Sequence, residues 1–146
     1  MRALILKATL IAVMVFAAIS CCNCKSKSRT AQPFIGTEWH LTRLMGVDIP
    51  IEAERFHVTF TPEGELTGIG ACNILMGNYT LLDNRKIELG HIASTRRFCP
   101  DMERETQFLE VLQNTTSYEI DGDILLLFHK GEMRAVLQAK SPTEQK

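Results

Sequence analysis

The stretch "SYEIDGDILLLFHKGEMRAVLQA" (Ser117 to Ala139) contains three apolar runs separated by two turns that each contain glycine. The first turn is Asp121-Gly122, a pair typical of two-residue β-hairpin turns, and the second is Lys130-Gly131. Around these turns apolar residues recur at every second position, as in strands with one buried face: Tyr118, Ile120, Ile124, Leu126, Phe128, Met133, Ala135 and Leu137. The stretch therefore predicts three successive antiparallel strands.

The same alternation recurs nearer the N-terminus. Trp39 and Leu41 alternate with polar residues, and the run over 56–60 has phenylalanine, valine and phenylalanine at alternate positions. Turn-forming residues at 62–64 and at Asp83-Asn84 separate further strands. These runs and the C-terminal stretch together predict seven or eight short strands, joined mostly by hairpins.

One segment, "CPDMERETQFLEVLQN", has helical spacing instead. It predicts a helix that begins at Pro100 or Asp101 and ends near Asn114. Its apolar residues recur at intervals of three and four, on one face that should close the apolar side of the sheet: Met102, Phe108, Leu109 and Leu112. The sequence thus predicts a mainly β (α+β) fold, a small antiparallel and barrel-like sheet of seven or eight strands. We expect an open barrel with one helix packed on it.

The first 20 residues have the pattern of a secretory signal peptide, with Arg2 and Lys7 before a short apolar run. The sequence Ala18-Ile19-Ser20-Cys21 resembles a bacterial lipobox, in which Cys21 would be acylated with palmitate-type chains after cleavage. We therefore expect a lipoprotein signal peptide over 1–20 and lipidation of Cys21. Cleavage that releases a soluble protein and a retained membrane anchor are the two alternatives.

The composition divides the rest of the chain into three parts. Residues 21–33 are polar and basic and predict a flexible tether, residues 34–139 form the folded domain, and residues 140–146 are a disordered tail. Lys and Arg number 16 against 17 Asp and Glu, so the chain has no excess of positive charge that would indicate nucleic acid binding. Since Cys22 is not acidic, we expect delivery to the outer membrane of a bacterial envelope, facing the periplasm or the cell surface.

Only Cys72 and Cys99 belong to the predicted fold. An exported domain meets oxidising conditions, so we expect these two cysteines to form a disulfide, with two buried reduced thiols as the alternative. A catalytic thiol needs an adjacent base and zinc needs four closely spaced ligands, and neither pattern surrounds these cysteines. We therefore expect no enzyme activity, no metal site and no cofactor.

Alternation places His40, His57 and His129 opposite their apolar neighbours, on the solvent side of their strands. If the strands that carry them pair, His40 and His57 could meet across one rung and bind a metal weakly. We expect scattered surface histidines instead.

Glu105 shares the apolar face of the predicted helix, where a carboxylate must be hydrogen-bonded, paired or near the rim. Thr95, Arg96 and Arg97 precede the helix and are its expected partners. We interpret Glu105 as a structural tie between helix and loop, with ligand binding or acid–base chemistry as the alternative.

The chain resembles the META domain family, to which the HslJ-like heat-shock lipoproteins belong. The resemblance spans about 34–139 and rests on these residues: Gly36, Thr37, Trp39, Gly70, Cys72, Asn73, Gly77, Tyr79, Ala93, Ser94, Thr95, Cys99, Pro100, Glu105, Phe108, Leu109 and Leu112. Ala71 departs from the glycine that often precedes the Cys-Asn pair, and Ile74 departs from the arginine that commonly follows it. The resemblance implies an exported, often lipid-anchored β fold with one helix and no established enzyme activity. It also implies association with heat shock, envelope stress and antibiotic resistance.

From these observations we expect a non-enzymatic exported lipoprotein domain. It would be held at the membrane by its lipid and act through contacts with envelope proteins in stress or antibiotic tolerance. The alternative is a carrier of an apolar or lipid ligand, in a barrel whose cavity would be lined by Trp39, Phe56 and Phe108.

Overall fold

The computed structural model describes residues 30–50 and 55–140. The expected signal peptide 1–20, Cys21, most of the tether and residues 141–146 lie outside the described residues. Within the described part of the chain, no helix has the length and apolar character needed to cross a membrane.

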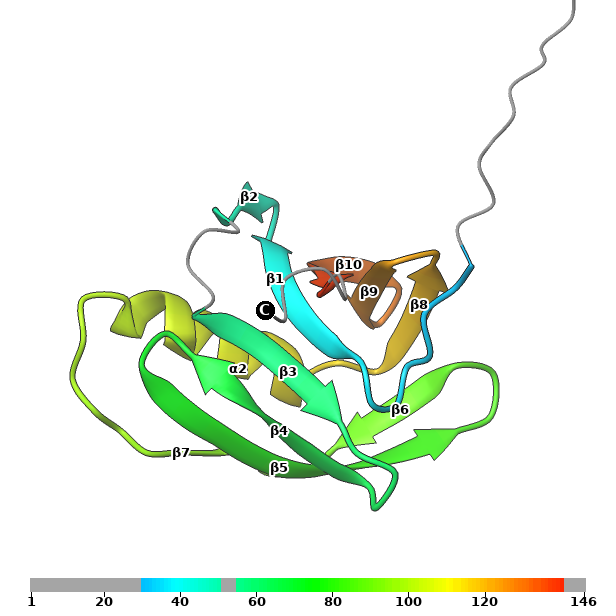
Figure 1. Cartoon of the computed structure of the whole chain (residues 1–146), viewed down its shortest axis with the longest axis horizontal. Coiled ribbons are helices and arrows are strands. Elements are labelled where there is room, and N and C mark those ends of the chain that lie inside the picture. Colours follow the sequence, from blue (N-terminus) through cyan, green and yellow to red (C-terminus); the bar gives the residue numbers. More distant parts are fainter. Residues whose placement is uncertain (1–29, 51–54, 141–146) are drawn as a thin grey trace, which may run out of the picture.

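The strands form a closed antiparallel barrel (Figure 1). Eight strands make the ring: β1 (Glu38–Leu44), β3 (Phe56–Phe60), β4 (Glu65–Gly70), β5 (Asn73–Leu82), β6 (Lys86–Leu89), β8 (Ser117–Asp121), β9 (Ile124–His129) and β10 (Glu132–Ala139). Two short strands lie outside it, β2 (Val47–Asp48) against β1 and β7 (Ala93–Ser94) against β5. The mainly β prediction with one helix is confirmed.

The expectation of an open barrel is wrong, because the first and last strands pair. β1 and β10 run antiparallel, with Trp39 opposite Ala139 and Leu41 opposite Leu137. The ladder between β6 and β8 is the shortest in the ring and pairs Lys86 with Ser117. Closure removes the unpaired backbone groups that a sheet edge would otherwise present.

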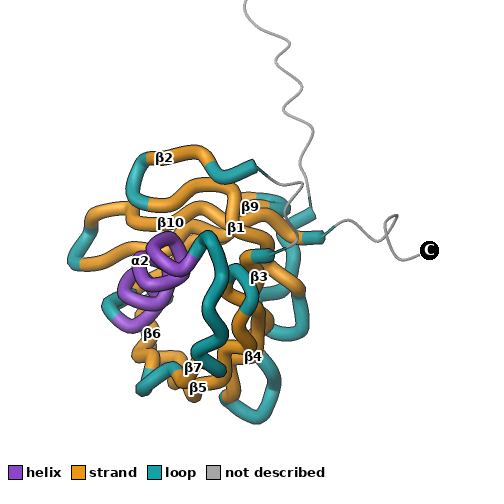
Figure 2. The backbone as a smooth tube through the Cα atoms, turned by 90° about the vertical axis from the view of Figure 1, so that its left-hand side faces the viewer, coloured by secondary structure: helices purple, strands orange, loops and turns teal. Residues whose placement is uncertain are grey.

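The helix, α2 (Met102–Gln113), lies on one side of the ring of strands, next to β10, as Figure 2 shows. It begins just after the predicted start at Pro100 or Asp101 and ends one residue before the predicted end near Asn114. Its C-terminal half lies beside His129 of β9 and Arg134 of β10. Its buried face consists of Glu105, Phe108, Val111 and Leu112.

The barrel interior is filled by side chains, as in other small barrels. Trp39 and Phe108 are fully buried and Phe56 is 4% exposed. Phe56 packs edge-on against Phe108, with ring centroids 5.9 Å apart. At another part of the core Phe34 stacks on Phe60 and on Tyr118, at centroid distances of 4.2 and 4.3 Å.

The last two strands correct the predicted burial pattern. Leu125 and Leu127 are the fully buried residues of β9, whereas the alternate set that begins at Ile124 is half-buried. In β10, Met133 is 43% exposed because the register shifts between Met133 and Ala135. Such a bulge places one extra residue in the strand and reverses the direction of the side chains beyond it.

The two histidines that alternation placed on the outer face lie opposite each other, His40 on β1 and His57 on β3. Both are half-buried rather than fully exposed, as is His129. The pairing that the sequence offered as one possibility is therefore present, and the expectation of scattered surface histidines is wrong for this pair.

Candidate functional site

A disulfide joins Cys72 and Cys99, as predicted. Cys72 lies in the turn between β4 and β5, and Cys99 lies in the segment just before α2. Their Cα atoms are 6.4 Å apart across a sequence separation of 27 residues. Both cysteines are half-buried, so the bond lies near the surface.

Next to this disulfide, Glu105 is buried, at 2% exposed. Asn73 Nδ2 donates to both of its oxygens at 2.9 Å, and Ser94 Oγ donates to Oε1 at 2.9 Å. The expected partners Thr95, Arg96 and Arg97 are therefore replaced by Asn73 and Ser94. Glu105 is a tie, but it joins the helix to β5 and β7.

Asn73 is fully buried and uses both ends of its amide. Its oxygen accepts hydrogen bonds from Thr95 Oγ1 at 2.9 Å and from the backbone nitrogen of Arg97. Its nitrogen, besides reaching Glu105, donates to the backbone oxygen of Arg97 at 3.1 Å. Since an asparagine amide offers both a donor and an acceptor, it can meet the carboxylate and the loop at once.

We call this group the Glu105 cluster: Cys72, Asn73, Ser94, Thr95, Cys99 and Glu105. Gly70 makes room for it, because a Cβ atom there would lie 3.1 Å from Glu105 Cγ. A Cβ at Gly68 would lie 2.2 Å from the backbone oxygen of His57. Both glycines thus mark close approaches, as a glycine inside a strand often does.

The chemistry open to the Glu105 cluster follows from the state of its sulfur atoms. Cys72 Sγ, Cys99 Sγ and one Glu105 oxygen lie within 4.8 Å of one another. Sulfur atoms joined to each other offer no thiolate, which is the form that binds metals and attacks electrophiles. The oxidised cluster therefore acts by holding chain segments in place.

The segment that the cluster holds is the loop 95–99. It is fixed at three points: Thr95 donates from its backbone nitrogen to Ile74, Arg97 is bonded to Asn73, and Cys99 carries the disulfide. Between the last two points, the side chain of Phe98 is 95% exposed. Sequence reasoning missed Phe98, although an aromatic residue directly after two arginines in a polar segment was the available signal.

The remaining motif residues lie elsewhere, around the start of β1. Thr37 Oγ1 donates to the backbone oxygen of Pro33 at 2.6 Å, and Trp39 Nε1 donates to that of Phe34 at 3.2 Å. Gly36 has a φ of +82°, which favours glycine. These contacts hold the segment before β1 so that Phe34 enters the core.

Tyr79 and Gly77 complete this second group, on β5. The hydroxyl of Tyr79 donates to the backbone oxygen of Thr61 at 2.6 Å. Burial, with a contribution from the charge of Glu63, raises the pKa of Tyr79 above its ordinary value. A Cβ at Gly77 would lie 3.0 Å from the side chain of Ile92, so this glycine permits close packing. Pro100 is exposed and lies two residues before the start of the helix.

Both groups of residues lie within the segment that matches a known family model. The META domain model matches residues 32–142. The chain belongs to the META domain family. None of the curated proteins matches it.

Three solved structures resemble this META domain in fold. A DUF4847 family protein from Bacteroides vulgatus is 20% identical with a TM-score of 0.57, over 74% of this chain and 94% of the other. A protein from Burkholderia xenovorans is also 20% identical with a TM-score of 0.59, over 74% and 84% of the two chains. A third structure, determined by NMR, is 17% identical with a TM-score of 0.55, over 70% and 87%.

Proposed function

We propose that this META domain is a non-enzymatic, exported bacterial lipoprotein that acts through protein contacts in envelope stress or antibiotic tolerance. One observation carries the protein-contact part of the proposal: Phe98 is almost fully exposed on a loop fixed on both sides by the Glu105 cluster. An exposed aromatic side chain on a loop fixed in this way can serve as an anchor that inserts into a pocket of a partner.

The composition of the loop supports protein contact. Arg96 and Arg97 are exposed next to Phe98, and aromatic residues and arginine are enriched among the residues that contribute most to protein interfaces. Because the loop is already fixed, little conformational entropy is lost when a partner binds it. The partner that fits is an envelope protein with an apolar pocket bordered by acidic groups.

The carrier alternative has less support. Trp39, Phe56 and Phe108, the residues that would line its cavity, are buried in a core where Phe56 already packs against Phe108. A ligand held there would have to displace these side chains, and close-packed interiors resist such rearrangement.

Site-specific photo-crosslinking in the native envelope tests the contact proposal. A photoreactive amino acid replaces Phe98 in one variant and Val47, which is 61% exposed on β2, in the control. We expect a discrete crosslinked protein from position 98 alone. We also expect Phe98→Ala to lower survival under heat or antibiotic without lowering the melting temperature. Equal crosslinking from both positions, or full survival of Phe98→Ala, would overturn the proposal.

Metabolic labelling with a palmitate analogue tests the anchor. We expect label on the protein, complete loss of label in Cys21→Ala, and retention in Cys22→Ala, which controls for the adjacent cysteine. A protein that reaches the envelope without any label would instead favour soluble secretion.

A further inference from the structure

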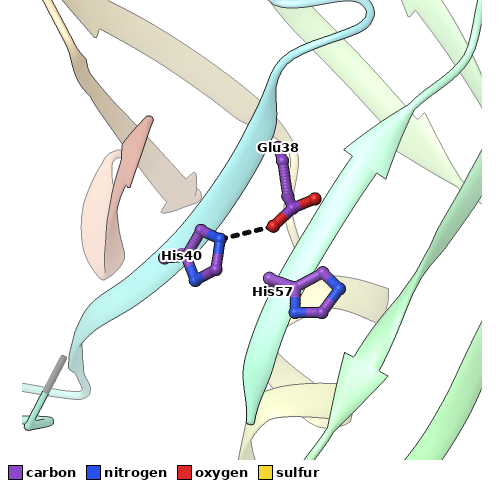
Figure 3. A group of neighbouring side chains, drawn as sticks. All are labelled: Glu38, His40 and His57. Carbon is purple, nitrogen blue, oxygen red and sulfur yellow. Dashed lines mark hydrogen bonds and ion pairs between the residues drawn. The ribbon is translucent and has the colours of Figure 1, made fainter. Parts of the chain in front are cut away.

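A second cluster of functional side chains lies on the outer face of β1 and β3 (Figure 3). Glu38 and His40 come from β1, and His57 comes from β3 directly opposite His40. The two imidazole rings lie 5.2 Å apart between centroids, at an interplanar angle of 29°. His40 Nε2 lies 2.7 Å from Glu38 Oε1.

The barrel core fixes the register that brings these side chains together. Trp39 and Val58 pair with each other across the same two strands, and both are fully buried. A slip of one residue would move these side chains out of the core, so the register is strongly specified. His40 and His57 are therefore held opposite each other by the fold.

Each of the three residues offers one ligand atom, and these atoms lie within 4.8 Å of one another. When each ligand atom lies 2.0–2.2 Å from a tetrahedral zinc ion, two ligand atoms lie about 3.4 Å from each other. Side-chain movements on the order of 1 Å would therefore bring the three ligand atoms into this geometry. Two imidazoles and one carboxylate form a ligand set used by zinc sites that keep a fourth position open. Imidazole favours zinc, nickel and copper, whereas magnesium and calcium prefer oxygen ligands.

We propose that Glu38, His40 and His57 bind a divalent transition metal ion, with Zn²⁺ as the ion that fits best and with one coordination position open. This site is separate from the Glu105 cluster and does not depend on the function proposed above. It differs from the expectation from sequence that the domain has no metal site.

Lys140 provides an internal competitor for this site. Its Nζ lies 3.3 Å from Glu38 Oε1, the oxygen that His40 also contacts. A metal ion would have to share or replace this ammonium group at the carboxylate. Removing the charge of Lys140 should therefore tighten metal binding, whereas a site that did not use Glu38 would respond little.

The test is a zinc titration of the full chain in detergent, monitored by competition with a chelating dye. Cys21, Cys22 and Cys24 are replaced by serine in every sample, because thiolates in the tether would themselves bind zinc. We expect one zinc ion per chain. His40→Ala and His57→Ala should each weaken the zinc affinity at least about tenfold. Losses of this size already follow when a residue that only hydrogen-bonds to a metal ligand is replaced.

Further variants make the result specific. His91→Ala is the matched control, since His91 is an exposed histidine outside the site and should leave the affinity unchanged. Lys140→Gln should tighten binding. His57→Gln keeps a side chain of similar size and serves if His57→Ala fails to fold. Zinc should also raise the melting temperature of the parent chain, because a ligand that binds only the folded state stabilises it, and this rise should vanish without His57.

The proposal is overturned if the serine-substituted chain binds no zinc. It is equally overturned if zinc affinity survives both the His40 and the His57 substitution, or if His91→Ala weakens binding as much as they do.

Discussion

Asn73 binds both carboxylate oxygens of Glu105 at 2.9 Å, and both side chains are buried. The same amide holds the backbone of Arg97 through its oxygen and its nitrogen. One side chain thus links α2 to the loop that carries Phe98. A substitution of Glu105 should therefore alter the position of Phe98.

The first prediction concerns Glu105 itself. Glu105→Leu should lower the free energy of unfolding by about 1 to 3 kcal/mol, because it leaves the buried donors of Asn73 and Ser94 without an acceptor. Glu105→Gln keeps one acceptor oxygen but turns an amide nitrogen towards Asn73, so its cost should be smaller but measurable. Urea unfolding followed by circular dichroism gives both values.

Glu110→Gln provides the control for this series, since Glu110 is exposed on the same helix. It should change the stability little. If Glu105→Leu stabilised the domain while abolishing the crosslink from position 98, the carboxylate would serve binding and not folding.

The second prediction concerns the disulfide. Cys72→Ala combined with Cys99→Ala should cost about 3 to 4 kcal/mol, because the bond closes a loop of about 28 residues in the unfolded chain. A reducing agent should destabilise the parent chain by a similar amount and leave the double variant unchanged. Non-reducing peptide mapping should find the two cysteine peptides joined. Two thiols that are readily alkylated in the native exported protein would contradict this.

The strand pattern could be predicted from sequence, but the buried face of β9 could not. The run from Ile124 to Phe128 is apolar at every position. The alternation of apolar and polar residues that marks a buried face is therefore missing, and the sequence does not show which alternate side chains point inward. Only the pairing of β9 with β8 and β10 directs Leu125 and Leu127 inward. Met133 was misplaced for a related reason, because a bulge leaves no local signal in its sequence.

The members of the candidate site and its disulfide were predictable, but the hydrogen bonds of Glu105 were not. Helical spacing placed Glu105 on the buried face, yet its partner Asn73 lies 32 residues earlier in the chain. Nearness in sequence favoured Thr95 to Arg97 as partners, and the pairing of β7 with β5 instead brings Asn73 and Ser94 to the carboxylate. Long-range contacts of this kind follow from topology, which local patterns do not specify.

The third prediction uses the raised pKa of Tyr79, whose cause is burial together with the charge of Glu63. Below the ordinary value of 10.0 the phenol is neutral in both states. Above it the unfolded chain releases the proton while the fold retains it, so stability falls as the pH rises towards the raised value. Tyr79→Phe should remove this alkaline loss and cost about 1 kcal/mol at neutral pH, through the lost bond to Thr61.

Absorbance titration of tyrosinate measures the shift directly. The chain has two tyrosines, so a Tyr118→Phe background leaves Tyr79 as the only one. Its midpoint in the folded protein should lie above 10.0 and return to about 10 in denaturant. A midpoint that is the same in both states would contradict the burial argument.

The fourth prediction concerns Ala71, which has a φ of +54° in the turn before Cys72 and is 6% exposed. An alanine in this left-handed region is strained by about 1 to 2 kcal/mol, whereas glycine is not. Ala71→Gly also removes a buried methyl group, at a cost of about 0.8 kcal/mol. The net effect should be a gain of up to about 1 kcal/mol, visible as a higher melting temperature.

The same substitution at Ala93 gives the matched control. Ala93 is exposed in β7, where its backbone has no positive φ, so Ala93→Gly should cost about 0.5 to 1 kcal/mol. The two alanine-to-glycine changes are therefore expected to have opposite signs. If both destabilise the domain equally, the strain at Ala71 does not contribute, and the family's glycine at this position needs another explanation.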